Sequence, residues 1–299
     1  MRRRLFLTAA ALTAAALAPV PTRAEPGVMG VVASFSILAD LLRQIGGERV
    51  VVTAIVPPGA DAHGYQPRPA DARAVAGARL VAMNGLGFDP WMQRLAQAAG
   101  FKGVTVVASV GTTPRAVTRG QGAASIDPHA WQDPRNGARY ANALAEGLAA
   151  ADPAAAGAYR TAGARLAADI LRLDDWIEAQ YAEVPPVRRR IITTHDAFGY
   201  HGARYGIEFL AAQGLSTESE PSAKAIAALV AQIKREKIRA VFLEKMTDPR
   251  LAQMLMRETG AVLGGAVYSD ALSDERGPAS TYTAMLRHNT TLFAASMRG

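Results

Sequence analysis

The sequence predicts an α/β protein made of two lobes, each with a mostly parallel sheet, joined by one long helix. Apolar strand-like runs alternate with helical patterns from residue 30 to about 148, and a second alternating series runs from 188 to the end. Alternation of this kind favours parallel strands covered by helices. An uninterrupted helical pattern separates the two series. We therefore divide the chain into an N-terminal lobe at 28–150, a connecting helix at 151–185 and a C-terminal lobe at 186–299.

In the first series, short runs rich in Val, Ile and Ala are each followed by a segment with helical spacing. Pro57, Gly59 and Asp61 follow the second run and form a turn signal, so a loop is expected directly after that strand. The expected strands lie at 30–34, 50–56, 80–84 and 104–109, and the expected helices at 37–45, 69–78, 90–100 and 133–150.

The second series has the same character. Its expected strands lie at 190–194, 208–214, 239–244 and 261–268, and its expected helices at 197–206, 222–237, 248–260 and 281–297.

The connecting segment at 152–184 has apolar residues at spacings of three and four and no internal proline. At 1.5 Å per residue, a helix of roughly 30 residues spans about 45 Å, enough to run along both halves. Such a connector holds two lobes at a nearly fixed angle. An ordinary crossover helix inside a single domain is the alternative.

The N-terminus predicts export. Residues 1–24 begin with three consecutive arginines after Met1, followed by an apolar stretch from Leu5 to about Ala18 and small residues before a cleavage point near Ala24, the pattern of a secretory signal peptide. The stretch "RRLFL" also matches a twin-arginine signal, so the export route stays open between the two pathways. We expect a periplasmic protein.

The amino-acid composition argues against several classes of function. Charged residues make up 20% of the chain and hydrophobic residues 49%, and no apolar run of membrane-spanning length follows the N-terminus, so a soluble mature chain is expected. Removing the signal segment takes away four arginines and lowers the net charge from +7 to about +3, which gives nucleic-acid binding little support. The chain has no cysteine, so a metal site would use imidazole and oxygen ligands.

Three histidines and one aspartate occupy similar places in the two series. His63 lies in the loop after the second expected strand, and His129 lies in a loop that leads into a helix. His195 directly follows a β-type run, and Asp270 follows the last apolar run. Open α/β proteins bind ligands at the carboxyl ends of their strands. Two residues come from each half, so we predict a site in the crevice between the lobes.

These side chains indicate a metal site. Three imidazoles and one carboxylate are the number and type of ligands in a closed tetrahedral zinc site. Calcium and magnesium prefer oxygen ligands, whereas imidazole suits zinc, copper, nickel or iron. The ligands are 66 or more residues apart, so no local metal-binding motif is involved.

The chain also resembles the zinc and manganese solute-binding proteins of bacterial ABC importers. Seven stretches carry the resemblance and occur in the family's order: "FSILADLLRQIGGERV", "PPGADAHGYQPRPAD", "NGLGFDPWM", "DPHAWQDPRNG", "TTHDAFGYHGARYGI", "SEPSAK" and "VYSDALS". Together they cover nearly the whole mature chain.

The resemblance implies the cluster A-I type solute-binding fold, with Zn²⁺ carried as the transported ligand at the positions of His63, His129, His195 and Asp270. It implies a monomer that delivers the ion to the transmembrane permease of an ABC transporter, with a periplasmic metallochaperone as a further partner. Manganese-type members usually carry Glu at the position of His195, so zinc is favoured. Many zinc-type members have a His-rich loop before the second ligand, whereas residues 113–126 contain no histidine.

Two rival functions remain. An exported zinc hydrolase would use the three histidines as ligands and Asp270 or Glu244 as general base, but the chain lacks an HExxH or nucleophile-elbow motif. A binding module for an organic ligand such as a metal chelate would need an aromatic-lined, histidine-poor cleft. Within the metal-binding interpretation, manganese is the alternative to zinc.

Four other polar or aromatic residues have expected roles. Glu244 lies at a strand end and either orients a ligand imidazole or has a capping or surface role. His201 follows His195 by six residues on the same helical segment, so a surface or supporting role is expected instead of metal ligation. Trp91 and Trp131 are expected to pack the lobes and the cleft wall.

Overall fold

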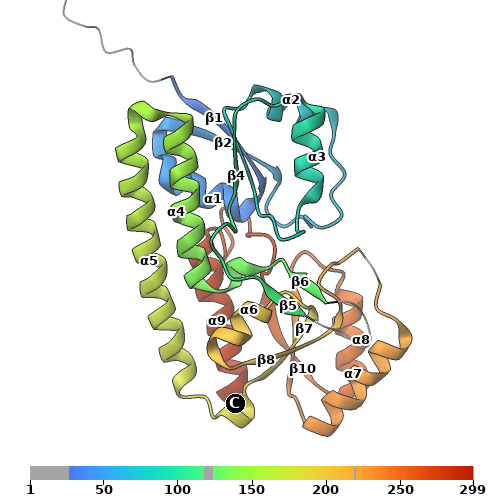
Figure 1. Cartoon of the computed structure of the whole chain (residues 1–299). Coiled ribbons are helices and arrows are strands. Elements are labelled where there is room, and N and C mark those ends of the chain that lie inside the picture. The colour runs from blue at the N-terminus through green and yellow to red at the C-terminus, as the bar shows by residue number, and fades with distance from the viewer. Residues whose placement is uncertain (1–26, 118–123, 219, 299) are drawn as a thin grey trace, which may run out of the picture.

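Two parallel sheets, one from each half of the chain, form the centres of two α/β lobes (Figure 1). The structure is a computed structural model that describes residues 27–117, 124–218 and 220–298. The predicted signal segment at 1–24 lies outside these residues. Two antiparallel helices lie on one side of the molecule, and the longer of the two runs along both lobes (Figure 1). The predicted fold class is therefore confirmed.

The N-terminal sheet has four parallel strands in the order β2-β1-β3-β4. Its central strands β1 and β3 are almost entirely buried, because helices cover both faces of a parallel sheet. The elements of this lobe are β1 (Met29–Phe35), α1 (Ser36–Gly46), β2 (Val50–Val56), α2 (Pro69–Gly77), β3 (Leu80–Met83), α3 (Pro90–Ala98) and β4 (Val104–Val107).

The C-terminal sheet has the order β10-β9-β7-β8, again entirely parallel. Counted from the first strand of each lobe, both sheets have the same order, 2-1-3-4. The elements are β7 (Arg190–His195), α6 (Gly199–Tyr205), β8 (Glu208–Gln213), α7 (Ala223–Glu236), β9 (Ala240–Glu244), α8 (Pro249–Thr259), β10 (Val262–Val267) and α9 (Tyr282–Arg298).

The predicted long helix is α5 (Ala156–Ala182), which follows α4 (Pro134–Ala151) as its antiparallel partner (Figure 1). It begins later than the predicted residue 152, because the chain first makes a 3₁₀ turn at Pro153–Ala155. With 27 residues it is about 40 Å long. Its apolar face packs against α4 and α1 of the N-terminal lobe and against α9. Helix α5 therefore contacts both lobes along one continuous helix.

One element was not predicted from the sequence. The segment between β4 and α4 contains a two-stranded antiparallel sheet, β5 (Arg115–Val117) and β6 (Ser125–Asp127). Each strand has only three residues and lacks an apolar run, so no strand pattern is visible there. Among the described residues, no helix combines the length and the apolar character that crossing a membrane requires.

Candidate metal centre

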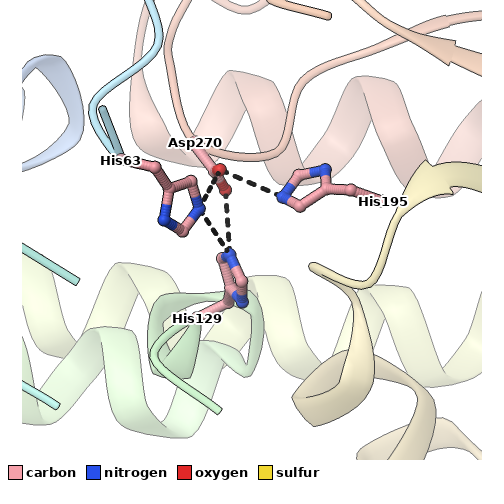
Figure 2. A group of neighbouring side chains, drawn as sticks. All are labelled: His63, His129, His195 and Asp270. Atoms are coloured by element: carbon pink, nitrogen blue, oxygen red, sulfur yellow. Dashed lines mark hydrogen bonds and ion pairs between the residues drawn. The ribbon is translucent and has the colours of Figure 1, made fainter. Parts of the chain in front are cut away.

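The four predicted side chains meet between the two lobes (Figure 2). His63 lies in the loop after β2, and His129 lies between β6 and a 3₁₀ turn at Ala130–Gln132. His195 is the last residue of β7, and Asp270 follows β10. The carboxyl ends of both parallel sheets thus face the same space, which brings residues up to 207 positions apart into one cluster.

The atoms that could bind a cation point toward one another. Asp270 Oδ2 lies 3.1 Å from His63 Nε2 and 3.1 Å from His195 Nε2, and Asp270 Oδ1 lies 3.6 Å from His129 Nε2. The Nε2 atoms of His63 and His129 are 3.3 Å apart. One ligand atom from each residue lies within 4.8 Å of all the others. The cluster is therefore small enough to surround a single ion.

The cluster is sealed from solvent on nearly all sides. His129 and His195 are 0% exposed, Asp270 is 1% exposed and His63 is 9% exposed. Both carboxylate oxygens of Asp270 and the Nε2 atom of His195 are buried without a hydrogen bond of normal geometry from the described residues. Buried polar atoms usually have a partner. A bound cation would satisfy these atoms, so the donor set fits a metal ion.

Mutual attraction among these groups shifts their pKa values. Burial alone would lower the pKa of His129, but the charge of Asp270 and the hydrogen bond and charge of Asp127 raise that pKa to about 9. The pKa of His195 is raised in the same way by Glu244 and Asp270. Burial acts to raise the pKa of Asp270, yet His129 and His195 hold it well below its usual range. Without a metal ion, the site therefore favours imidazolium beside carboxylate.

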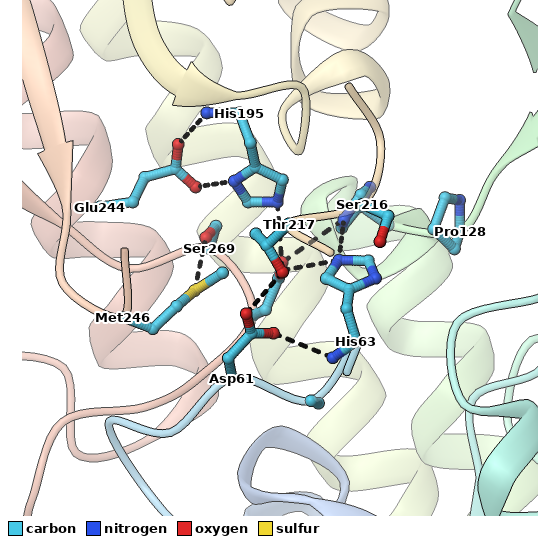
Figure 3. Close-up of polar contacts among 12 residues, drawn as sticks. Asp61, His63, Pro128, His195, Ser216, Thr217, Glu244, Met246 and Ser269 are labelled. Atoms are coloured by element: carbon cyan, nitrogen blue, oxygen red, sulfur yellow. Dashed lines mark hydrogen bonds and ion pairs between the residues drawn. The ribbon is translucent and has the colours of Figure 1, made fainter. Parts of the chain in front are cut away.

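Two further carboxylates orient the imidazoles. His129 Nδ1 lies 2.9 Å from Asp127 Oδ1, which also accepts a hydrogen bond from the backbone N–H of His129. His195 Nδ1 lies 2.5 Å from Glu244 Oε2, and Glu244 Oε1 accepts from the His195 backbone N–H at 2.8 Å (Figure 3). An acceptor at Nδ1 leaves Nε2 free to face the cluster. Glu244 thus makes the contact that the first of its two predicted roles requires.

Sequence reasoning did not identify Asp127. The only signal was its place two residues before His129, where an aspartate can accept from the following backbone N–H.

Contacts from both lobes fix the loop of His63. Asp61 Oδ1 accepts from the His63 backbone N–H at 2.9 Å, and the Thr217 hydroxyl of the C-terminal lobe lies 2.5 Å from Asp61 Oδ2 (Figure 3). Trp91 donates to the backbone carbonyl of Ala62 at 2.9 Å. A cavity of about 540 Å³ is lined in part by His63, which is the most exposed of the four residues.

His201 lies outside the cluster. It is 1% exposed, so the predicted surface role is wrong, whereas a supporting role fits its contacts. Its Nε2 lies 2.9 Å from the Tyr181 hydroxyl of α5, and its Nδ1 lies 3.2 Å from the backbone carbonyl of Gln132. Trp91 and Trp131 are buried, as predicted, and the Trp131 ring lies against His129.

Comparison with known proteins gives consistent matches over almost the whole chain. Residues 31–296 match the family model described as "Zinc-uptake complex component A periplasmic". The manganese-binding lipoprotein MntA of Halalkalibacterium halodurans is 32% identical over 268 residues, which cover 89% of this chain and 88% of that protein. The iron-binding protein YfeA of Yersinia pestis is 31% identical over 86% of this chain and 82% of that protein.

Solved structures agree with these sequence matches. The periplasmic zinc-binding protein TroA of Treponema pallidum superimposes with a TM-score of 0.83 at 27% identity, covering 89% of this chain and 98% of that one. The three similar proteins are thus named for manganese, iron and zinc.

Proposed function

The chain belongs to the family of periplasmic components A of zinc-uptake complexes, and from that premise we propose that it captures Zn²⁺ between its lobes for import. The proposed ligands are His63, His129, His195 and Asp270, and the ion is cargo, not a resident cofactor. The observation that carries the proposal is the convergence of three imidazole nitrogens and one carboxylate within 4.8 Å, nearly sealed from solvent.

The donor set favours zinc over manganese. Zinc sites in proteins are usually tetrahedral with nitrogen, sulfur or carboxylate ligands, whereas carboxylate, carbonyl and water oxygens suit manganese better. Three of the four proposed ligands are imidazoles. Manganese remains the alternative cargo, because a similar protein is named for that metal.

The protein acts by binding and is not an enzyme. Catalytic zinc sites usually have three protein ligands and an open position for a water molecule. The four proposed ligands supply the number that a closed tetrahedral site needs, and Glu244 contacts His195. A hydrolase that uses Asp270 or Glu244 as general base therefore has no support in this geometry.

We further propose that the protein works in the periplasm and passes its ion to the transmembrane permease of an ABC transporter. Membership of a periplasmic uptake-complex family supports this step. Two of the proposed ligands come from each lobe, so separating the lobes would break the ligand set. In this proposal, contact with the permease separates the lobes and releases the ion.

Metal content and competition test the proposal. The purified exported protein is analysed for bound metals, stripped with a chelator, and titrated with zinc against manganese, beside the variant His195→Glu. We expect the wild-type protein to hold zinc more tightly than manganese and His195→Glu to move the preference toward manganese. Failure of the wild-type protein to retain or bind zinc would overturn the proposal.

A further inference from the structure

The segment that carries Asp270 is bonded to the N-terminal lobe, although it follows a strand of the C-terminal lobe. The backbone carbonyl of Leu272 accepts from the N–H of Gly59 at 2.9 Å. Farther along, the N–H of Tyr282 donates to the buried carboxylate of Asp40 in α1 at 2.8 Å. Asp270 therefore approaches His63 and His129 from a segment anchored on their own side of the cleft.

Two buried side chains hold the peptide bond that immediately precedes Asp270. The carbonyl oxygen of Ser269 accepts from Trp131 Nε1 at 2.9 Å and from the Gln132 side-chain amide at 2.7 Å. Trp131 is 0% exposed and Gln132 is 1% exposed. Both donors belong to the 3₁₀ turn Ala130–Gln132, which follows His129 directly. The turn that follows His129 therefore also fixes the backbone directly before Asp270.

We propose that Gln132 and Trp131 are positioning residues that set the place of Asp270 relative to His129. This inference rests on the proposed metal site. A carbonyl oxygen has two lone pairs, and here two buried donors occupy them, which fixes the orientation of the peptide plane. Rotation of that plane would swing the Asp270 carboxylate out of the cluster. The hydroxyl of Tyr282 also lies 2.5 Å from the carbonyl of Trp131, so the Asp270 segment and the turn are bonded in both directions.

The chemistry requires a donor at residue 132. Gln132→Met keeps the approximate size and shape but cannot donate, so the Ser269 carbonyl loses one partner. Gln132→Glu places a carboxylate oxygen against that carbonyl and is expected to be worse than Met. Trp131→Phe removes the indole donor while keeping an aromatic ring beside His129. Each of these three substitutions removes one hydrogen-bond donor to the Ser269 carbonyl, in a chemically different way.

The experiment measures zinc affinity by competition with a chelating dye in the full mature chain. We expect Gln132→Met and Trp131→Phe each to weaken zinc binding by about tenfold, within the range usual for residues that orient metal ligands, and the double variant to weaken it further. Tyr159→Phe is the matched control, because it removes the hydrogen bond of another buried side chain, 3.0 Å to Asp152, without touching Ser269 or the residues next to His129. Its zinc affinity should equal that of the wild-type protein.

A double-mutant cycle separates positioning from a general loss of stability. Gln132→Met is repeated in an Asp270→Ala background, where no carboxylate remains to be positioned. If Gln132 acts through Asp270, its effect on zinc affinity disappears there. An equal effect in both backgrounds, or unchanged affinity in the Trp131→Phe/Gln132→Met double variant, would overturn the proposal. If Asp270→Ala weakens zinc binding while Gln132→Met leaves it unchanged in the wild-type chain, the proposed function stands and only this inference is refuted.

The spectrum of bound Co²⁺ gives a second measure in folded, metal-loaded protein. Visible absorption of Co²⁺ is strong in four-coordinate sites and weak in six-coordinate ones. In the double variant, water ligands would replace the carboxylate of a misplaced Asp270. The absorption of bound Co²⁺ should therefore be weaker. An unchanged spectrum at full metal loading would show that Asp270 binds normally without the two donors.

Discussion

Glu244 places its carboxylate oxygen Oε2 2.5 Å from His195 Nδ1, and both side chains are fully buried. The same carboxylate accepts from the backbone N–H of His195 and from the hydroxyl of Thr194. Glu244 therefore fixes both the strand end and the imidazole plane of His195. Burial would raise the pKa of Glu244, but the charge of His195 lowers it, so the carboxylate stays ionised.

The first prediction concerns this pair. Glu244→Gln keeps the side-chain shape but removes the charge that orients His195, so zinc affinity should fall by about 10- to 100-fold. Competition titration measures this loss. Glu208→Gln is the control, because Glu208 is an exposed carboxylate on β8 that pairs with Arg190 at 2.8 Å. Zinc affinity that stays at the wild-type value in Glu244→Gln would contradict the orienting role.

The second prediction separates charge from position at His129. Asp127 accepts from His129 Nδ1 and also lies 3.2 Å from the partly exposed Arg115 guanidinium. Asp127→Asn removes the ionised acceptor and should weaken zinc binding by about tenfold. Arg115→Gln leaves that acceptor in place and should change zinc affinity less, because the Arg115 guanidinium contacts the other carboxylate oxygen, Asp127 Oδ2, whereas His129 Nδ1 lies at Oδ1. Isothermal calorimetry compares the two variants, and equal losses would contradict a specific role of the Asp127–His129 contact.

The fold was predictable because most of its strands have a clear sequence pattern. The runs at 50–56 and 80–84 are apolar over most of their length and end at turn residues, so β2 and β3 were expected within two residues of their observed bounds. The hairpin of β5 and β6 was missed because three-residue strands on a partly exposed edge need no apolar pattern. Its pairing depends on neighbours that local sequence does not reveal.

The candidate site was predictable in part. His63, His129, His195 and Asp270 share a strand-end or loop context, and the structure brings all four together, although ion binding by them remains a proposal. Gln132 carried no signal, because its role depends on Ser269, which lies 137 residues farther along the chain. Local spacing reveals where a strand ends, but it does not show which distant backbone group a side chain meets.

The third prediction concerns stabilisation by the cargo. A ligand that binds only the folded chain stabilises it by RT ln(1 + [L]/Kd), about 4 kcal/mol at a thousandfold excess over Kd. Zinc should therefore raise the melting temperature of the chelator-stripped protein, and Asp270→Ala should abolish most of that rise. His288→Ala is the control, since His288 lies on α9 and is bonded to the backbone carbonyl of Ala266, outside the cluster. A full zinc-dependent rise in Asp270→Ala would mean that Asp270 is not a ligand.

The last prediction concerns His201 and the acid stability of the metal-free protein. Burial lowers the pKa of His201 to about 4, and the hydrogen bond to the backbone carbonyl of Gln132 and the charge of Asp174 oppose this effect only in part. The neighbouring Tyr181 and Tyr205 bear no charge near neutral pH, since burial raises the pKa of both. In the unfolded chain the imidazole titrates near 6.5. Between pH 6.5 and 4 the unfolded state therefore binds a proton that the folded state does not.

The direction of the pH dependence of stability follows from proton linkage. The free energy of unfolding falls as pH falls through this window, and neutral His201 contributes about 3 kcal/mol of that loss by pH 4. His201→Phe cannot titrate, so it should be less stable than the wild-type protein at pH 7, where it lacks the contact with Tyr181, by about 1 kcal/mol. This difference in the free energy of unfolding between the two proteins should close or reverse by pH 4.5. Urea denaturation in the presence of chelator measures both values, and the other histidines cancel because both proteins carry them. A difference that is the same at pH 7 and pH 4.5 would show that folding does not lower the pKa of His201.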